Sequence, residues 1–215
     1  MTLDIGRSFT YMFEDESWIM KIVVGGILGL IPIVDLMVLG YTIEALKRSA
    51  DGMDIPLPEW DDFGGKFMKG LFGFVIFLVY AIPLVVLACC ALGATPLAAR
   101  NETLAGLVPI FARLCVPCLS LVWMIVMAVF LPGAWMRYAT TGEFMSAFQF
   151  GELFSFISPN VANYVVAIML WAVAMFIASF GMIACFVGVF FTGFWALLVT
   201  AHVLGQVQRE SLTVA

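Results

Sequence analysis

The sequence IPLPEWDDFGGKFMKG, residues 55–70, is the longest polar run in a chain that is otherwise mostly apolar. Its charged side chains are too costly to bury in hydrocarbon, so the run must lie in water. The segments on either side of it can then each be classified as spanning a bilayer, dipping into it or lying on its surface. Residues 55–70 therefore fix the topology from which the rest of the fold is predicted.

The composition is that of an integral membrane protein. Of the 215 residues, 63% are hydrophobic and 12% are charged, whereas soluble domains are about half apolar and about a quarter charged. We therefore expect one membrane domain, residues 1–215. The net charge of -5 and the lack of a basic cluster argue against a nucleic-acid partner.

The apolar run at residues 18–46 has two readings. As one span it is long enough for a bilayer that needs about 20 residues, but it would bury Pro32 and Asp35. As a helical hairpin broken at residues 31–34, each arm is short and the turn carries Asp35. Positive residues lie near both ends of the run, and the positive-inside rule then places both ends in the cytoplasm. The charge pattern favours the hairpin, although one span stays open.

The remaining segments complete an all-α, polytopic helical bundle. It has four full spans, a short N-terminal helical hairpin and two interfacial amphipathic helices. A short polar outer loop at 95–103 and an outer interfacial piece at 104–114 separate the first two spans. The expected parts are an interfacial helix, hairpin and cytoplasmic elbow (1–66), two spans (67–94 and 115–136, within 67–136), an interfacial helix (137–159), two spans (160–180 and 181–207, within 160–207) and a tail (208–215).

A weak internal duplication is also visible. The segment GLIPIVDLMVLGY in the first half aligns with GMIACFVGVFFTGF in the second, so that Gly29 matches Gly181 and Ile31 matches Ile183. Duplicated units are common in membrane folds. Because the second member of this pair reads as a helical hairpin, the repeat favours the same reading for residues 18–46.

Several blocks together resemble one family. These are EDESW, IPIV followed by GYTIEALKR, LPEWDDFGGKFMKG, RYATTGEFMSAFQFGE and FTGFWALLVTAHVLGQ. The chain is similar, over nearly its whole length, to the prokaryotic membrane proteins grouped as domain of unknown function 4013. The resemblance implies a polytopic fold and a prokaryotic membrane location. It implies no reaction and no site residues.

The sharpest chemical motif is Cys115-Val116-Pro117-Cys118. A CxxC pair at the outer end of a span is the arrangement used by membrane thiol oxidoreductases. Such enzymes need a second pair on an outer loop, whereas Cys89 and Cys90 lie within a predicted span. The structural alternative, small cysteines in a proline-kinked helix, needs no chemistry and is favoured.

Other ionisable residues near the membrane are few. Asp35 and Arg113 are predicted at the outer boundary as interfacial anchors or a structural pair, and His202 is predicted to make an interhelical or interfacial hydrogen bond. A transport pathway would have only five polar side chains: Ser120, Asn163, Thr192, Thr200 and His202. No motif for a nucleotide, a catalytic triad or a metal is visible, so we expect no cofactor and no metal.

These observations predict a non-enzymatic accessory or scaffolding subunit of the cell membrane, with both termini in the cytoplasm. Its partners would be the lipid bilayer and other membrane-protein subunits or a second copy. The alternatives are a small transporter or lipid-handling protein, and then a thiol oxidoreductase using Cys115 and Cys118. The expected partner contact is an ordered elbow carrying Pro58, Glu59, Trp60, Asp61 and Asp62, with the aspartates capping a helix that begins near Phe63.

Overall fold

The computed structural model describes residues 3–98, 106, 108–183 and 187–214, and every regular element in these residues is helical. The chain divides into two compact units. Unit 1 comprises Met1–Ile76 and Pro132–Ala215, and unit 2 comprises Phe77–Leu131. The all-helical fold expected from the sequence is therefore confirmed for the part of the chain that the structure describes.

Four helical segments are long and apolar enough to cross a membrane. They are Phe63–Ala94, Val108–Thr141, Phe150–Ile183 and Gly188–Ser211. The four predicted spans are thus confirmed, and each observed segment is longer than, or shifted from, the predicted one. The expected interfacial piece at 104–114 overlaps the second segment, because residues 108–110 and the π-helical turn η2 (Phe111–Cys115) continue directly into α6 (Val116–Thr141).

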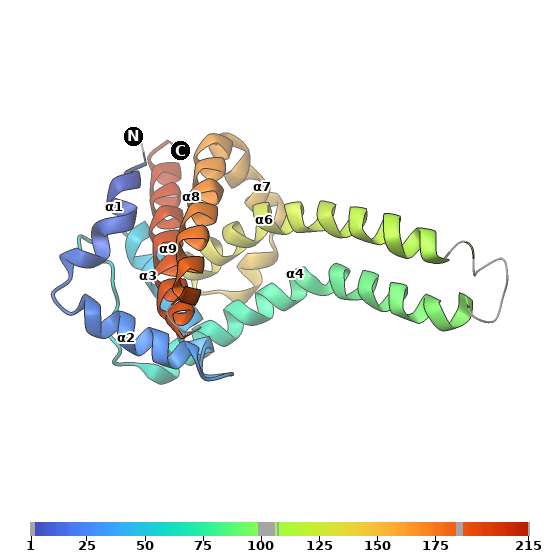
Figure 1. Cartoon of the computed structure of the whole chain (residues 1–215). Helices are drawn as coiled ribbons and strands as arrows, with labels where there is room; N and C mark the ends of the chain where they lie inside the picture. The colour runs from blue at the N-terminus through green and yellow to red at the C-terminus, as the bar shows by residue number, and fades with distance from the viewer. Residues whose placement is uncertain (1–2, 99–105, 107, 184–186, 215) are drawn as a thin grey trace. The chain divides into compact units, whose positions relative to one another are not determined.

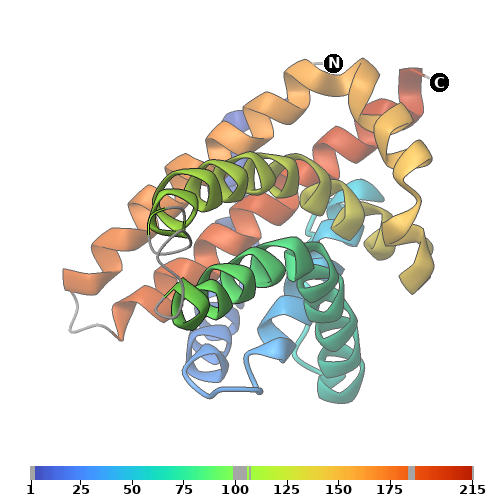
Figure 2. The same ribbon diagram turned by 90° about the vertical axis from the view of Figure 1, so that its right-hand side faces the viewer.

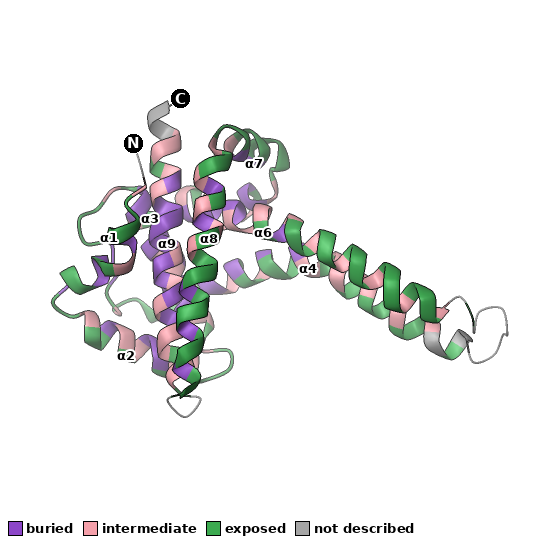
Figure 3. Ribbon diagram, turned by 45° about the horizontal axis from the view of Figure 1, so that its top comes forward, coloured by how far each residue is buried: buried purple, intermediate pink, exposed green. Residues whose placement is uncertain are grey.

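Unit 1 is built around α9 (Gly188–Val214). α9 packs against α1 (Ile5–Thr10), α2 (Trp18–Gly29), α3 (Leu36–Ala50) and α8 (Val161–Ser179) (Figure 1). Figure 2 shows α8 and α9 running side by side. Small and branched side chains of α9 form the core of this unit, including Ala196, Leu198, Val199, Ala201 and Val203. The buried colour in Figure 3 accordingly follows α9 and α3.

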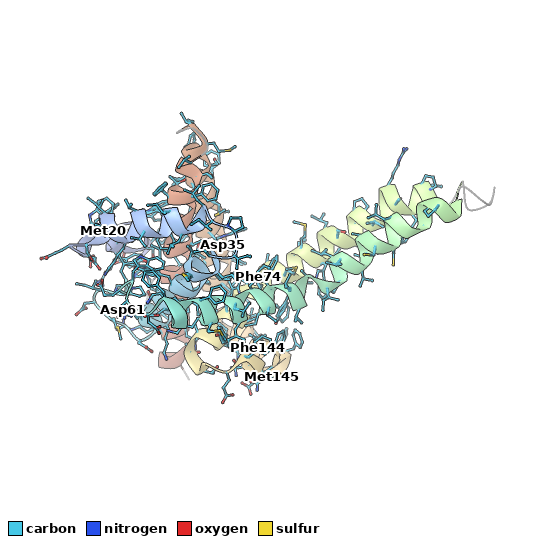
Figure 4. All side chains as sticks on the ribbon, turned by 90° about the horizontal axis from the view of Figure 1, so that it is seen from below. Met20, Asp35, Asp61, Phe74, Phe144 and Met145 are labelled. Atoms are coloured by element: carbon cyan, nitrogen blue, oxygen red, sulfur yellow. The ribbon has the colours of Figure 1, made fainter. Side chains whose placement is uncertain are left out.

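Residues 18–50 form two helices rather than one span. α2 ends at Gly29 and α3 begins at Leu36, and a turn joins them. Ile33 in this turn has a φ of 74°, a left-handed conformation that a helix cannot continue. The hairpin reading is therefore correct, and Asp35 lies at the turn as expected. Figure 4 shows Asp35 at this turn and Met20 on the outward side of α2.

The helices α3 and α4 (Phe63–Ala98) cross at two glycines. A Cβ atom added at Gly40 would lie 2.7 Å from the carbonyl carbon of Lys66, and one added at Gly70 would lie 2.7 Å from that of Leu36. Only hydrogen atoms separate the two backbones at this point. The absence of side chains at Gly40 and Gly70 therefore permits the crossing.

The segment predicted as one interfacial helix, 137–159, is divided. α6 extends to Thr141 and ends at Gly142, whose φ of 73° is the left-handed conformation that terminates helices. The 3-10 helix η3 (Phe144–Phe148) and α7 (Phe150–Ile157) follow. Leu153 and Ile157 of α7 are buried whereas Phe150 and Phe154 are exposed, so α7 is amphipathic in the sense expected.

Arg137 holds this segment against the end of α6. Its guanidinium donates to the carbonyl oxygen of Ser146, to the side chain of Gln149 and to the carboxylate of Glu152. In the same unit, the ring of Phe144 lies 5.8 Å from that of Phe72. Figure 4 shows the neighbouring Met145 beside Phe144, and this side chain is exposed. The location of α1 and α7 at a membrane interface stays a prediction.

Unit 2 contains α4 from Phe77 to its end and the first part of α6. The indole nitrogen of Trp123 donates to the carbonyl oxygen of Tyr80 across the pair, at 2.9 Å. Pro83 lies inside α4, and Pro117 follows the π-helical turn η2. Because proline has no N–H for the preceding turn, Pro117 gives a physical reason for irregular bonding there.

Candidate functional site

The elbow, residues 55–62, joins α3 to α4 and has no regular secondary structure. Pro56, Leu57 and Pro58 are buried. The hydroxyl group of Tyr41 donates to the carbonyl oxygen of Pro58 at 2.7 Å, and Arg48 donates to that of Leu57 at 3.3 Å. Two backbone carbonyl groups of the elbow are thereby satisfied by side chains of α3.

Trp60 links the elbow to α2 by a hydrogen bond. Its indole nitrogen donates to the carbonyl oxygen of Lys21 at 3.1 Å, and its ring stacks on Tyr41 with centroids 4.3 Å apart. Phe63 and Phe194 lie beside the same ring, at 6.1 and 6.2 Å. Trp60 therefore belongs to an aromatic cluster of unit 1, in which both its ring and its N–H find partners.

Two buried lysines lie on either side of the elbow. The Nζ of Lys21, whose side chain is 3% exposed, lies 2.6 Å from Asp15 and 2.5 Å from Glu59. A buried ammonium is stable only when it is paired, so Glu59 fixes the position of the elbow over α2. The carboxylate of Glu59 is itself 64% exposed.

The second buried lysine is Lys66, whose side chain is 1% exposed. Its Nζ lies 3.4 Å from Asp61 and 3.6 Å from Glu44, and 5.9 Å from the ring centre of Tyr41. Glu44 also accepts hydrogen bonds from Lys69 and Arg48. Glu59 and Asp61 are therefore the two carboxylates through which the elbow neutralises buried lysines.

The pKa values of two carboxyl groups at these ion pairs lie below their ordinary range. Burial raises the pKa of Asp15, but hydrogen bonds from Lys21 and Ser17 outweigh it and hold this pKa low. The pKa of Asp61 is lowered by the backbone N–H of Asp62 and by Lys66. Both groups are therefore charged at neutral pH, as pairing with lysine requires.

Asp62 caps α4. Its carboxylate accepts a hydrogen bond from the backbone N–H of Gly65 at 2.8 Å, and its carbonyl oxygen accepts one from Lys66. This is the N-cap geometry expected from the aspartate pair. Figure 4 shows Asp61 at the start of α4. Of the five residues predicted as a partner contact, Pro58 is buried, Trp60 is half-buried, and Glu59, Asp61 and Asp62 are exposed.

The ion pairs that Lys21 forms with Asp15 and with Glu59 of the elbow were not predicted from the sequence. One signal was available, because Lys21 is a lone cation at the start of the apolar run 18–30. A charge in such a position must find a counter-ion. The identity of that counter-ion could not be read from the sequence, since Glu59 lies 38 residues away along the chain.

The cysteine motif belongs to unit 2, whereas these ion pairs belong to unit 1. Cys115 ends the turn η2 and Cys118 lies in α6, both in unit 2, and both are exposed free thiols. Cys89 and Cys90 are likewise exposed and free, and Cys185 lies outside the described residues. No disulfide is present among the cysteines that the structure describes.

The remaining ionisable residues singled out by sequence lie in different environments. Asp35 and Arg113 are exposed and belong to different units, and neither takes part in an ion pair within the described ranges. His202 is buried, and its Nδ1 lies 3.2 Å from the hydroxyl group of Ser8 on α1. The predicted interhelical hydrogen bond of His202 is therefore confirmed.

Most of the polar side chains that a transport pathway would use make hydrogen bonds within the protein. Asn163 donates to Glu210, Thr192 donates to the carbonyl oxygen of Ala178, and Thr200 donates to that of Ala196. These bonds join α8 to α9 or satisfy the backbone of α9. In the part of the chain that the structure describes, no group of three or more His, Cys, Asp or Glu side chains is placed to hold a metal ion.

The model of the family described as "protein of unknown function (DUF4013)" matches residues 23–187. Comparisons with curated proteins and with solved structures give no match.

Proposed function

The chain belongs to the DUF4013 family of proteins of unknown function. From its own residues, we propose that it is a non-enzymatic accessory or scaffolding subunit in a membrane. The elbow is the surface that binds its partner, another membrane-protein subunit with a basic patch. The observation that carries this proposal is the ordered elbow with its exposed carboxylates of Glu59, Asp61 and Asp62.

The elbow suits binding because it is already fixed before a partner arrives. Its backbone is bonded to Tyr41 and Arg48, and its acidic side chains pair with Lys21 and Lys66. A surface with few rotamers left to order loses less conformational entropy on association. An acidic surface of this kind also attracts a basic partner and sets the orientation of approach.

The long apolar helices support placement in a bilayer with room for other subunits. In the most apolar stretches of Phe63–Ala94 and Val108–Thr141, only 11% and 6% of the residues are buried. Lipid tails or the helices of other subunits therefore cover these surfaces.

The proposed location is the cytoplasmic membrane of a prokaryotic cell, with the elbow and both termini in the cytoplasm. Arg48, Lys66 and Lys69 gather around Glu44 beside the elbow. Such positive residues next to apolar segments favour the cytoplasmic side.

Purification in mild detergent or in nanodiscs, followed by native mass spectrometry, tests the proposal. We expect a stoichiometric partner subunit, or a second copy of the chain, to remain bound. The variant Glu59→Gln keeps an oxygen that can accept from Lys21 but removes a charge from the exposed surface, and should weaken the complex at least tenfold. Asp35→Asn is the matched control, because Asp35 is an exposed carboxylate outside the elbow.

Two results would contradict the proposal. One is a folded, monodisperse monomer that retains no partner under any mild condition. The other is a complex that Glu59→Gln and Asp35→Asn weaken equally, because the elbow would then contribute nothing specific to it.

A further inference from the structure

Unit 1 contains a polar cavity that is separate from the elbow. It has a volume of about 400 Å³ and lies where α1, the end of α3 and the last turns of α9 meet. Residues that line it include Arg7, Ser49, Gly52, Asp54, His202 and Arg209. A cavity of this size is within the range of small-ligand sites.

Ser49, one of the residues that line the cavity, carries a buried hydroxyl group. The residue is 7% exposed, and its Oγ makes no hydrogen bond with any described residue. Buried hydroxyl groups nearly always have a partner, and one left without a partner weakens the fold. An acceptor atom of a ligand in the cavity would supply the missing bond.

Arg209 lies over Gly52 in the cavity wall. Gly52 has a φ of 73°, and a Cβ atom at this position would lie 3.0 Å from both Cζ and Nη1 of Arg209. The guanidinium therefore lies close to the backbone of the glycine, where a larger residue would push it aside. Arg209 forms no hydrogen bond or ion pair within the described ranges, so its N–H groups are free to bind an oxyanion.

The histidine in the cavity wall has a defined tautomer. The backbone N–H of Asp4 donates to Oε1 of Gln206, which directs the Nε2 amide group of Gln206 toward Nδ1 of His202, 3.0 Å away. That amide can only donate, so Nδ1 must accept and the ring proton is on Nε2. The stacked ring of Tyr11, 4.2 Å away, holds the imidazole in this orientation.

Some of the charged groups that line the cavity already have hydrogen-bond or ion-pair partners. Arg7 pairs with Glu14 and donates to the carbonyl oxygen of Asp54, and Glu210 accepts a hydrogen bond from Asn163. The carboxylate of Asp4 accepts from the backbone of Arg7. The exposed carboxylate of Asp54 has no partner among the described side chains, and it does not pair with Arg209.

The guanidinium of Arg209 and the carboxylate of Asp54, neither of which pairs with a described residue, therefore line the same cavity. We propose that the cavity binds a zwitterionic group, with its oxyanion at Arg209 and Ser49 and its ammonium at Asp54. The chemistry is that of phosphoethanolamine, which reaches the protein either as a lipid headgroup or as a soluble glycerophosphodiester. A highly charged polyanion does not fit, because three carboxylates line the cavity.

The full chain in phosphatidylglycerol nanodiscs allows both sources to be tested. One arm titrates glycerophosphoethanolamine, and the other adds phosphatidylethanolamine to the bilayer; the melting temperature is measured in both. We expect at least one arm to raise it in a saturable manner, and the arm that does so identifies the source. Binding should weaken at least tenfold in Arg209→Gln and in Asp54→Asn.

Ser49→Ala separates a binding role from a structural one. Because the hydroxyl group has no partner in the described structure, its removal should leave the ligand-free melting temperature unchanged or higher, while ligand binding weakens. Lys47→Gln is the control, since Lys47 is an exposed cation of the same helix that does not line the cavity, and it should bind as the unmodified protein does. The proposal is overturned if neither arm shifts the melting temperature, if the variants respond like the unmodified protein, or if inorganic phosphate alone gives an equal shift.

Discussion

Replacing Gly40 or Gly70 by alanine perturbs the backbone contact between α3 and α4. The added Cβ at Gly40 would lie 2.7 Å from the carbonyl carbon of Lys66 and 2.9 Å from the backbone nitrogen of Gly70, whereas ordinary contacts begin at 3.4 Å. The atoms it meets are backbone, which no rotamer change can move aside. The two helices must therefore separate by more than half an ångström.

The expected cost follows from two opposing effects. Overpacking of this kind costs about 1–3 kcal/mol, and rigid backbone on both sides places the cost at the upper end. Alanine regains about 1 kcal/mol of helix propensity over glycine. We expect each variant to lower the free energy of unfolding by about 2 kcal/mol, and the pair Gly40→Ala and Gly70→Ala to add less than the sum, because they relieve each other's contact.

The measurement is reversible unfolding in mixed micelles of detergent and sodium dodecyl sulfate, followed by circular dichroism. Gly93→Ala and Gly151→Ala are matched controls, because no atom lies within 4 Å of a Cβ added at either position. These two should be neutral or more stable than the unmodified protein. If Gly40→Ala is as stable as Gly93→Ala, the close crossing of α3 and α4 does not exist.

Three further predictions concern the ion pairs, the elbow and the thiols. Asp15→Asn should lower the free energy of unfolding by about 3 kcal/mol, because Lys21 is left buried with only an exposed carboxylate beside it. The pKa of Asp15 is lowered in the folded protein. The stability that the Asp15 carboxylate contributes is therefore complete above about pH 4 and is lost as the pH falls through the folded-state pKa. The free energy of unfolding, measured as a function of pH, should fall with acid in the unmodified protein and fall less in Asp15→Asn. Trp60→Phe should cost about 1 kcal/mol through the lost hydrogen bond to Lys21, and an unchanged unfolding midpoint would show that this bond is unimportant. The double variant Cys115→Ser, Cys118→Ser should unfold within about 0.5 kcal/mol of the unmodified protein and leave every cellular phenotype intact, and a lost phenotype in a folded variant would instead support thiol chemistry.

The sequence predicts the helical class and the number of long apolar helices because those depend on composition and length alone. The hairpin at residues 18–46 is predictable for a related reason, since Pro32 and Asp35 are unfavourable in mid-membrane. The aspartate cap of α4 is equally local, because Asp62 and Gly65 are three residues apart. In each case the deciding interaction lies within one or two turns of chain.

Features that depend on distant contacts were not predictable. The pairing of Lys21 with Glu59 and the stacking of Trp60 on Tyr41 join segments that no periodicity relates. The division of residues 137–159 depends on Gly142 adopting a positive φ, which the sequence permits without requiring it. The polar cavity combines residues from both ends of the chain, so its lining could be recognised only in the folded structure. The internal duplication stays a prediction.

Site-specific photo-crosslinking from the elbow tests the central claim most directly. A photoreactive residue would replace Ile55, an exposed residue of the elbow, and in a matched control would replace Ile33, which is exposed at the turn between α2 and α3. The account predicts one stoichiometric crosslinked subunit from position 55, lost in the Glu59→Gln background, and no such product from position 33. Crosslinks to lipid alone from position 55 in folded protein, or the same product from both positions, would contradict it.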